Sequence, residues 1–181
     1  FTITTDVCSE YNELGRKKVI ELLKDEVKKG ITNVEEIIGG KFGSKENPCL
    51  VSVRSGARVS MPGMMDTVLN LGLNDAAVEG LAAKSGNPRF AWDSYRRFVQ
   101  MYGDVVLGMK PESKEEHDPF EVIIDDLKDK KGVLNDTDLD TDDLKEMVTE
   151  FKKAILTQTG ANFPEDPWDQ LWGAVMAVFD S

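Results

Sequence analysis

The stretch of residues 50–75 contains side chains suited to holding phosphate. It opens with an apolar, largely β-branched run at residues 50–53, which predicts a strand, and then breaks into the small, basic segment RSGAR. A guanidinium pairs bidentately with phosphate oxygens, and glycine lets backbone N–H groups approach the same oxygens. Arg54 and Arg58 are therefore candidate phosphate ligands, although a salt bridge at a strand end would also explain Arg54.

A second loop at residues 60–67 separates this strand from residues 68–71, which resume an extended apolar pattern. The chain has no Gly-x-x-x-x-Gly-Lys-Ser/Thr sequence, so it is not a P-loop protein. The Gly39-Gly40 pair follows a predicted helix, and we interpret it as a helix end and a loop.

Helical patterns occupy most of the remaining sequence. They begin at capping residues or at a proline in the first position, and they end at glycines. The predicted helices cover residues 5–14, 17–29, 34–38, 75–84, 88–105, 119–130, 141–159 and 167–179. We expect Gly30 to separate the second helix from the third, and the helix that begins at Pro88 to be the longest.

The composition is that of a globular protein with one domain, or one domain and a subdomain. The formal net charge of the 181 residues is -11, which argues against a general nucleic-acid binder. Acids dominate residues 110–150, whereas basic residues slightly outnumber acids in residues 41–109, where the candidate phosphate strand lies. No apolar run is long enough to span a bilayer.

Metal chemistry finds little support in the sequence. Cys8, Cys49 and one histidine are too few for a zinc site, and we expect two free thiols in a reducing compartment. The acidic run at residues 135–143 has Thr141 and Met147 where an EF-hand needs glycine and glutamate. We interpret this run as a helix-capping loop and predict no metal site in the chain.

The run VSVRSGARVSMPGMMDTVLNLGLND, followed by GNPRFAWDSYRRFVQMYGDVV, closely resembles the N-terminal ATP-binding region of pyruvate, phosphate dikinases. The resemblance covers most of the chain, from FTITTDVC at its start to LNDTDLDTDDLKE and DQLWGAVMAVFDS near its end. The sequence MPGMMDT makes it specific, because the related phosphoenolpyruvate synthases and water dikinases keep the strand and the arginine but not this sequence.

This resemblance implies a phosphotransferase that converts ATP, phosphate and pyruvate to AMP, pyrophosphate and phosphoenolpyruvate. It implies that Arg54 contacts the ATP phosphates, with Arg58 as the second candidate. Gly63, Met65 and Thr67 would lie in the loop that covers these phosphates, mainly through backbone N–H groups. The implied cofactor is ATP with Mg²⁺, whose acidic ligands are expected outside this sequence.

The family also implies the fold, in which two ATP-grasp lobes close on the nucleotide. We predict an α+β, predominantly helical chain: a partial ATP-grasp lobe with an inserted helical subdomain. Residues 1–73 would form part of the lobe, residues 74–160 the helical subdomain, and residues 161–181 a helix that returns to the lobe.

We further expect this chain to be an inactive fragment of a longer protein. It begins without methionine, and His117 has no motif around it, so the phosphoacceptor histidine and every other catalytic residue are expected elsewhere. The full-length protein is expected to be a homodimer that contacts neither nucleic acid nor membrane. We expect it in the cytoplasm, although members of the family also occur in plastids and glycosomes.

Arg96 and Arg97 form a separate hypothesis. They could dock the phosphohistidine domain of the full-length chain by pairing with its acids, or they could be solvated surface arginines. A function of another class, a non-catalytic helical interaction module, would use these arginines or the acidic loop. The equivalent lobe of a phosphoenolpyruvate synthase or a water dikinase is a further alternative.

Overall fold

The computed structural model describes residues 1–56, 64–111 and 117–181. Its helices are α1 (Asp6–Leu14), α2 (Arg16–Ile38), α3 (Ala77–Ser85), α4 (Pro88–Met101), α5 (Pro119–Lys131), α6 (Thr141–Thr159) and α7 (Pro167–Asp180). The strands are β1 (Lys41–Phe42), β2 (Pro48–Cys49), β3 (Val51–Val53) and β4 (Val68–Leu71). The π-helical turn η1 (Tyr102–Val106) follows α4, and the 3-10 turn η2 (Asp136–Asp138) precedes α6. The predicted α+β, predominantly helical class is confirmed.

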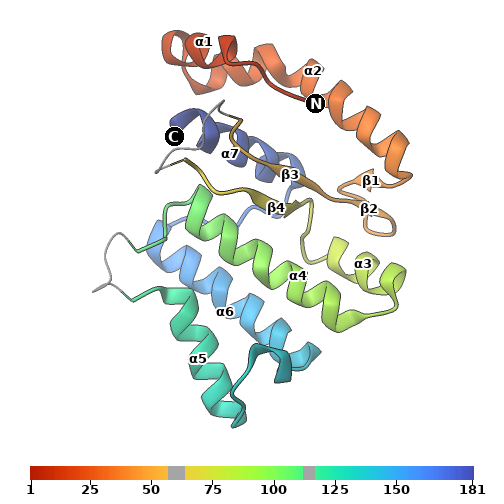
Figure 1. Ribbon diagram of the computed structural model, residues 1–181, viewed down its shortest axis with the longest axis vertical. Helices are drawn as coiled ribbons and strands as arrows, with labels where there is room; N and C mark the ends of the chain where they lie inside the picture. Colours follow the sequence, from red (N-terminus) through yellow and green to blue (C-terminus); the bar gives the residue numbers. More distant parts are fainter. Residues whose placement is uncertain (57–63, 112–116) are drawn as a thin grey trace.

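The elements form layers (Figure 1). Helices α1 and α2 lie on one side of α7 and the short strands, and α3, α4, α6 and α5 lie on the other side. The strands thus lie between helices, although Ser52 of β3 and Leu69 of β4 remain exposed.

Most predicted helix ends are confirmed, because short polar side chains satisfy the free N–H groups of the first turn. The Asn87 side chain accepts a hydrogen bond from the Phe90 N–H at 3.0 Å, ahead of Pro88. The Asp118 and Asp166 carboxylates cap α5 and α7 in the same way.

Two predictions about the helices are wrong. Helix α2 continues through Gly30 to Ile38, and its 23 residues make it longer than the 14-residue α4. Gly30 is buried, and a Cβ atom there would lie 2.5 Å from the ring of Phe1. The glycine therefore permits close packing inside a continuous helix, where the sequence pattern indicated a break. Strands β1 and β2, which pair in parallel, were not predicted.

Strands β3 and β4 form an antiparallel ribbon. Val51 pairs with Leu71 and Val53 pairs with Val68, with an irregularity between the two pairs. Residues 54–56 and residues 64–67, the last part of the predicted phosphate loop, therefore leave the ribbon at the same end.

Two hydrophobic cores meet at this ribbon. The larger core joins β4 to α3, α4, α5 and α6, and includes the edge-to-face contacts of Phe163 with Phe98 and Tyr102, at 5.6 Å between ring centroids. The smaller core comprises side chains of α2, β1 and α7. Val51 and Val53 pack against both cores, so burial on each side holds β3 in place. The division into a lobe and a helical subdomain stays a prediction.

No helix within residues 1–56, 64–111 and 117–181 has the length and apolar character needed to cross a membrane.

The close approach of α3 to the loop before β2 gives a first prediction. A Cβ atom at Gly80 would lie 2.0 Å from the backbone oxygen of Lys45. Gly80→Ala gains about 1 kcal/mol of helix propensity but forces two backbone segments apart. We expect a net loss of about 2–3 kcal/mol in the free energy of unfolding, measured by urea denaturation.

Gly30→Ala is the matched control, since it adds the same methyl group to a buried glycine within a helix. The group that it meets is the Phe1 side chain, which is 66% exposed and can turn away. We expect a change below about 1 kcal/mol. Equal losses in the two variants would contradict the packing described for α3.

Candidate functional site

The open end of the β3–β4 ribbon gathers three of the predicted site residues. Arg54 and Thr67 lie just beyond the Val53–Val68 pair that closes the ladder. The hydroxyl of Ser55 donates a hydrogen bond to the carbonyl oxygen of Met65 at 3.4 Å, which holds the two segments side by side. Arg58 and Gly63, the other two candidates, lie outside the described residues.

Arg54 is exposed and has no hydrogen bond or ion pair with any residue of the described chain. The alternative of a salt bridge at the strand end is therefore not seen among these residues. A guanidinium without an acidic partner keeps all its donors available to an anion.

A groove of about 580 Å³ lies beside the segment of residues 64–67, over α4 and η1. Its lining is Asp66, Thr67, Arg96, Arg97, Gln100, Met101, Asp104, Val105, Lys110 and Asp136. A second hollow of about 510 Å³ contacts the same segment through Met64, Met65 and Asp66, and continues to the end of α7. The segment that contains Met65 and Thr67 is thus flanked by open space.

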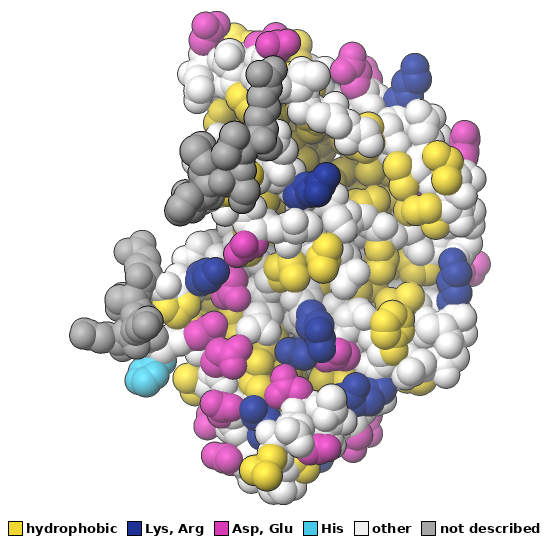
Figure 2. Space-filling model, in the orientation of Figure 1, with side chains coloured by type: hydrophobic (Ala, Val, Ile, Leu, Met, Phe, Trp, Pro, Cys, Tyr) yellow, Lys and Arg dark blue, Asp and Glu magenta, His cyan; other side chains and the backbone are white. Residues whose placement is uncertain are grey.

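Charges of both signs line these hollows. Lys110 pairs with Asp66 at 3.4 Å, which connects the segment before β4 to the turn after η1. Figure 2 shows basic and acidic side chains intermixed on this face, with acids more frequent in its lower half. The lining of the groove has three acids and three cations, so the groove is close to neutral and does not form a strongly basic phosphate channel.

Arg96 and Arg97 share one carboxylate but differ in burial. Arg96 is 5% exposed, and its Nη2 lies 2.7 Å from Asp93 Oδ1 and 3.9 Å from Asp136 Oδ2. The Arg97 side chain is 64% exposed, and its Nε lies 3.0 Å from Asp93 Oδ2. The interpretation of Arg96 as a solvated arginine is wrong, because it connects α4 to η2 from a buried position. The docking role stays a prediction, and Arg97 is the better placed of the two for it.

Asp104 is a groove residue that sequence reasoning did not select. Its Oδ1 atom is buried and has no hydrogen-bond partner. The pKa of this carboxyl is raised from 3.8 to about 6, first by burial and then by the Asp118 and Glu121 carboxylates, while Lys110 opposes the shift. No motif indicated Asp104, Lys110 or Asp66 as neighbours, because the fold brings together residues that are far apart in sequence.

The acidic run at residues 135–143 caps helices, as predicted. The Asp140 carboxylate accepts hydrogen bonds from the N–H groups of Asp142 and Asp143, and Asp143 pairs with Lys131 at 2.5 Å. Within the described chain, no group of three or more His, Cys, Asp and Glu side chains is arranged to hold a metal. Cys8 and Cys49 are free thiols, in agreement with the prediction.

The different surroundings of the two neighbouring arginines give a second prediction. Arg96→Met leaves Asp93 partly desolvated with only Arg97 to pair with it, and we expect a loss of about 2 kcal/mol in the free energy of unfolding. Arg97→Met removes an exposed pair and should cost less than about 0.5 kcal/mol. Thermal and urea denaturation of both variants would check this, and a larger loss for Arg97→Met would contradict the assigned roles.

Asp104 gives a third prediction, on pH dependence. Because folding raises the pKa of this carboxyl, the folded chain favours its protonated form, and stability falls as pH rises from about 4 to about 6. Asp104→Asn removes the free-energy cost of burying an ionised carboxylate at this position. After a discount for partial exposure, we expect the variant to be about 1 kcal/mol more stable near pH 7 and equal to the native protein near pH 4. A stability difference that does not change with pH would contradict this account.

Comparison with known proteins gives matches along the whole chain. No family model matches it. A pyruvate, phosphate dikinase of Clostridium symbiosum is 57% identical, with 100% of this chain and 20% of that protein aligned. The chloroplastic pyruvate, phosphate dikinase 1 of Arabidopsis thaliana is 52% identical over 99% of this chain and 18% of its own length. A pyruvate, phosphate dikinase of Giardia intestinalis is 50% identical, with 100% of this chain and 20% of that protein aligned. The chain thus spans about one fifth of the length of these curated relatives.

Proposed function

Because the chain belongs to the pyruvate, phosphate dikinase family, we propose that it forms part of the ATP-binding lobe of a phosphotransferase of this kind. The proposed overall reaction converts ATP, phosphate and pyruvate to AMP, pyrophosphate and phosphoenolpyruvate, through a phosphohistidine on another domain. The observation that supports a site in this chain is the exposed Arg54, which pairs with no residue of the described chain and lies opposite Met65 and Thr67 at the open end of the β3–β4 ribbon.

The chemistry of phosphoryl transfer suits such a site. The reaction needs positioning of the phosphates and neutralisation of the charge that spreads over their oxygens, with little covalent work by the protein. Arg54 would supply a fixed positive charge and a planar set of donors. The backbone N–H of Met65 and the hydroxyl of Thr67 would donate to the same oxygens from the opposite side, and Arg58 and Gly63 would complete the loop.

The proposed cofactor is the magnesium ion that accompanies ATP and shields its phosphates. The described residues offer no cluster of three or more His, Cys, Asp or Glu side chains for it. We therefore assign its protein ligands to parts of the full-length protein outside these residues, and assign to this chain only contacts with the phosphates.

The proposed architecture is a partial ATP-grasp lobe with an inserted helical subdomain. Its support is the distribution of the two cores: one comprises side chains of α2, β1 and α7, and the other consists mostly of side chains of α3 to α6. The larger core also includes lobe residues of β4 together with Phe163 and Ala174, so the two parts would pack directly on each other. In this arrangement residues 1–73 and 161–181 form the lobe, and residues 74–160 form the subdomain. The exposed Arg97 would then pair with an acid of the phosphohistidine domain in competition with Asp93, which it contacts at 3.0 Å.

Titration of this chain with Mg-ATP tests the site directly. Amide resonances of Arg54, Met65 and Thr67 should shift in the native protein and stay unchanged in Arg54→Ala. In the full-length enzyme, Arg54→Ala should lower kcat/KM by roughly 30- to 1000-fold, which corresponds to about 2–4 kcal/mol for one preorganised donor.

Lys24→Ala is the matched control, since Lys24 is an exposed cation on α2 and is not part of the proposed site. It should leave both the shifts and the kinetics unchanged. Native-like kcat/KM in Arg54→Ala would refute the proposal. Shifts confined to the helices, seen on addition of a protein partner in place of ATP, would instead favour the interaction-module alternative.

A further inference from the structure

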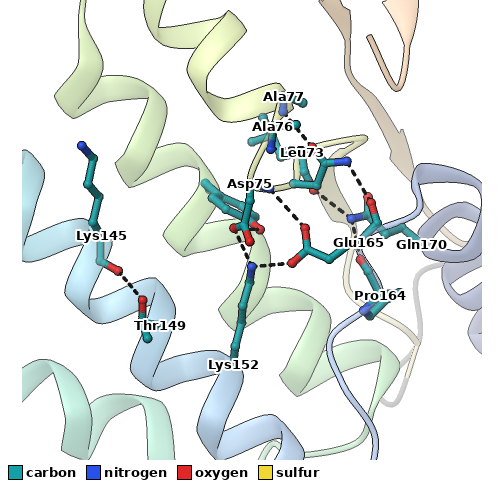
Figure 3. Close-up of polar contacts among 12 residues, drawn as sticks. Leu73, Asp75, Ala76, Ala77, Lys145, Thr149, Lys152, Pro164, Glu165 and Gln170 are labelled. Carbon is teal, nitrogen blue, oxygen red and sulfur yellow. Dashed lines mark hydrogen bonds and ion pairs between the residues drawn. The ribbon is translucent and has the colours of Figure 1, made fainter. Parts of the chain in front are cut away.

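Gln170 is an uncharged polar side chain that lies fully inside the molecule. It is on α7 and is 0% exposed. Its Oε1 accepts the Gly72 N–H at 2.9 Å, and its Nε2 donates to the carbonyl oxygens of Leu73 and Pro164, each at 2.8 Å (Figure 3). Both amide hydrogens and one acceptor are thus used, all by backbone groups, and Gly72 and Leu73 are distant in sequence.

The backbone that Gln170 holds is a tight turn with unusual dihedral angles. At the end of β4, Asn70 has a φ of 62° and Gly72 has a φ of 108°. A Cβ atom at Gly72 would lie 3.1 Å from the carbonyl oxygen of Cys49, so this turn lies directly against β2. Asparagine and glycine both adopt positive φ more readily than other residues, so the sequence favours a sharp turn here. Gln170 holds the two residues that follow the strand, Gly72 and Leu73.

The pairing of β3 with β4 is short. Strand β3 has three residues and β4 has four, and the ladder between them is irregular. Burial of Val68 and Leu71, each 0% exposed, favours one register, because a slip of one residue would turn these side chains to the opposite face. The contacts of Gln170 with Gly72 and Leu73 add a fixed point at the end of β4. Thr67 lies five residues before Gly72 along this strand, so a displacement at the turn is transmitted to the ribbon end.

We propose that Gln170 is a positioning residue, which fixes the register of β4 and thereby holds Met65 and Thr67 opposite Arg54. This inference rests on the proposed function of the ribbon end. Gln170 acts through the backbone and does not touch the ligand.

A second set of contacts holds the chain beyond the turn and provides a control. Lys152 Nζ lies 2.6 Å from Asp75 Oδ1 and also pairs with Glu165, and the Tyr95 hydroxyl donates to Asp75 Oδ1 at 3.0 Å (Figure 3). The Glu165 carboxylate accepts the Asp75 N–H at 3.2 Å. These contacts join Asp75 to the loop before α7, but they do not reach Gly72 or Leu73. Lys152→Met therefore disturbs the same region without releasing the end of β4.

The test compares Gln170→Met with Lys152→Met. Methionine has nearly the length of glutamine but cannot pair with the three backbone groups. Without ATP, Gln170→Met should shift the amide resonances of Met65, Thr67 and Val68, and in the full-length protein it should weaken Mg-ATP binding by about tenfold or more, because a small displacement of positioning groups is costly. Lys152→Met should leave these resonances in place and the affinity within about twofold of native.

Gln170→Glu provides a second measurement, the pH dependence of Mg-ATP affinity, which a loss of stability alone would not change. A protonated glutamic acid can accept from Gly72 and donate to one carbonyl oxygen, whereas the ionised form turns its oxygens toward two carbonyl oxygens. The Mg-ATP affinity of Gln170→Glu, relative to the native protein, should therefore fall as pH is raised. The same ratio for Gln170→Met should not depend on pH. If Gln170→Met fails to fold, Gln170→Glu at low pH provides the comparison.

The outcomes separate this inference from the proposed function. If Mg-ATP binding depends on Arg54 but folded Gln170→Met binds as the native protein does, the positioning role is overturned and the ATP site stands. If the native protein does not bind Mg-ATP through Arg54, the proposed function fails. In that case the amide resonances of Met65, Thr67 and Val68 still test whether Gln170 fixes the register of β4. Unchanged shifts in Gln170→Met would overturn that role.

Discussion

The pairing of Val53 with Val68 determines where this chain can present a binding site. It brings Arg54 and Thr67, which are separated by a long loop in the sequence, to the same end of a two-stranded ribbon. Such a ribbon would be marginal alone, but side chains of both cores pack against β3, and burial on two sides supplies the rigidity that its few backbone hydrogen bonds cannot. The helices therefore stabilise the geometry of a short, otherwise weak element.

Cations near the ribbon differ in whether their charge is already neutralised. Arg96 and Arg97 share the Asp93 carboxylate, and Lys110 pairs with Asp66, so ligand binding at these groups would compete with existing ion pairs. Arg54 has no such partner within residues 1–56, 64–111 and 117–181. An anion that reaches Arg54 therefore competes with no acid of the described residues, which is the physical reason to propose the phosphates there and not in the groove over α4 and η1.

Local sequence signals predicted the elements well, because caps such as Asn87 and Asp118 act within a few residues. They failed at Gly30, where a tertiary contact with Phe1 and not helix termination explains the glycine. They also missed Asp104 and Gln170, whose environments depend on partners up to about a hundred residues away. The sequence pattern did not predict the burial of Arg96 for the same reason, since Asp136 lies near it only in the folded chain. Arg54 was a candidate from its chemistry at a strand end, whereas Met65 and Thr67 were selected through the family resemblance, and the role of the three residues stays a prediction.

Paramagnetic relaxation by Mn-ATP measures the position of the bound phosphates most directly. The manganese ion stays on the phosphates and broadens amide resonances steeply with proximity, so it locates the triphosphate without any substitution. The account predicts the strongest broadening at Ser55, Met65 and Thr67. Broadening centred on Gln100 and Lys110, with the ribbon end unaffected, would place the nucleotide in the groove and contradict the central claim.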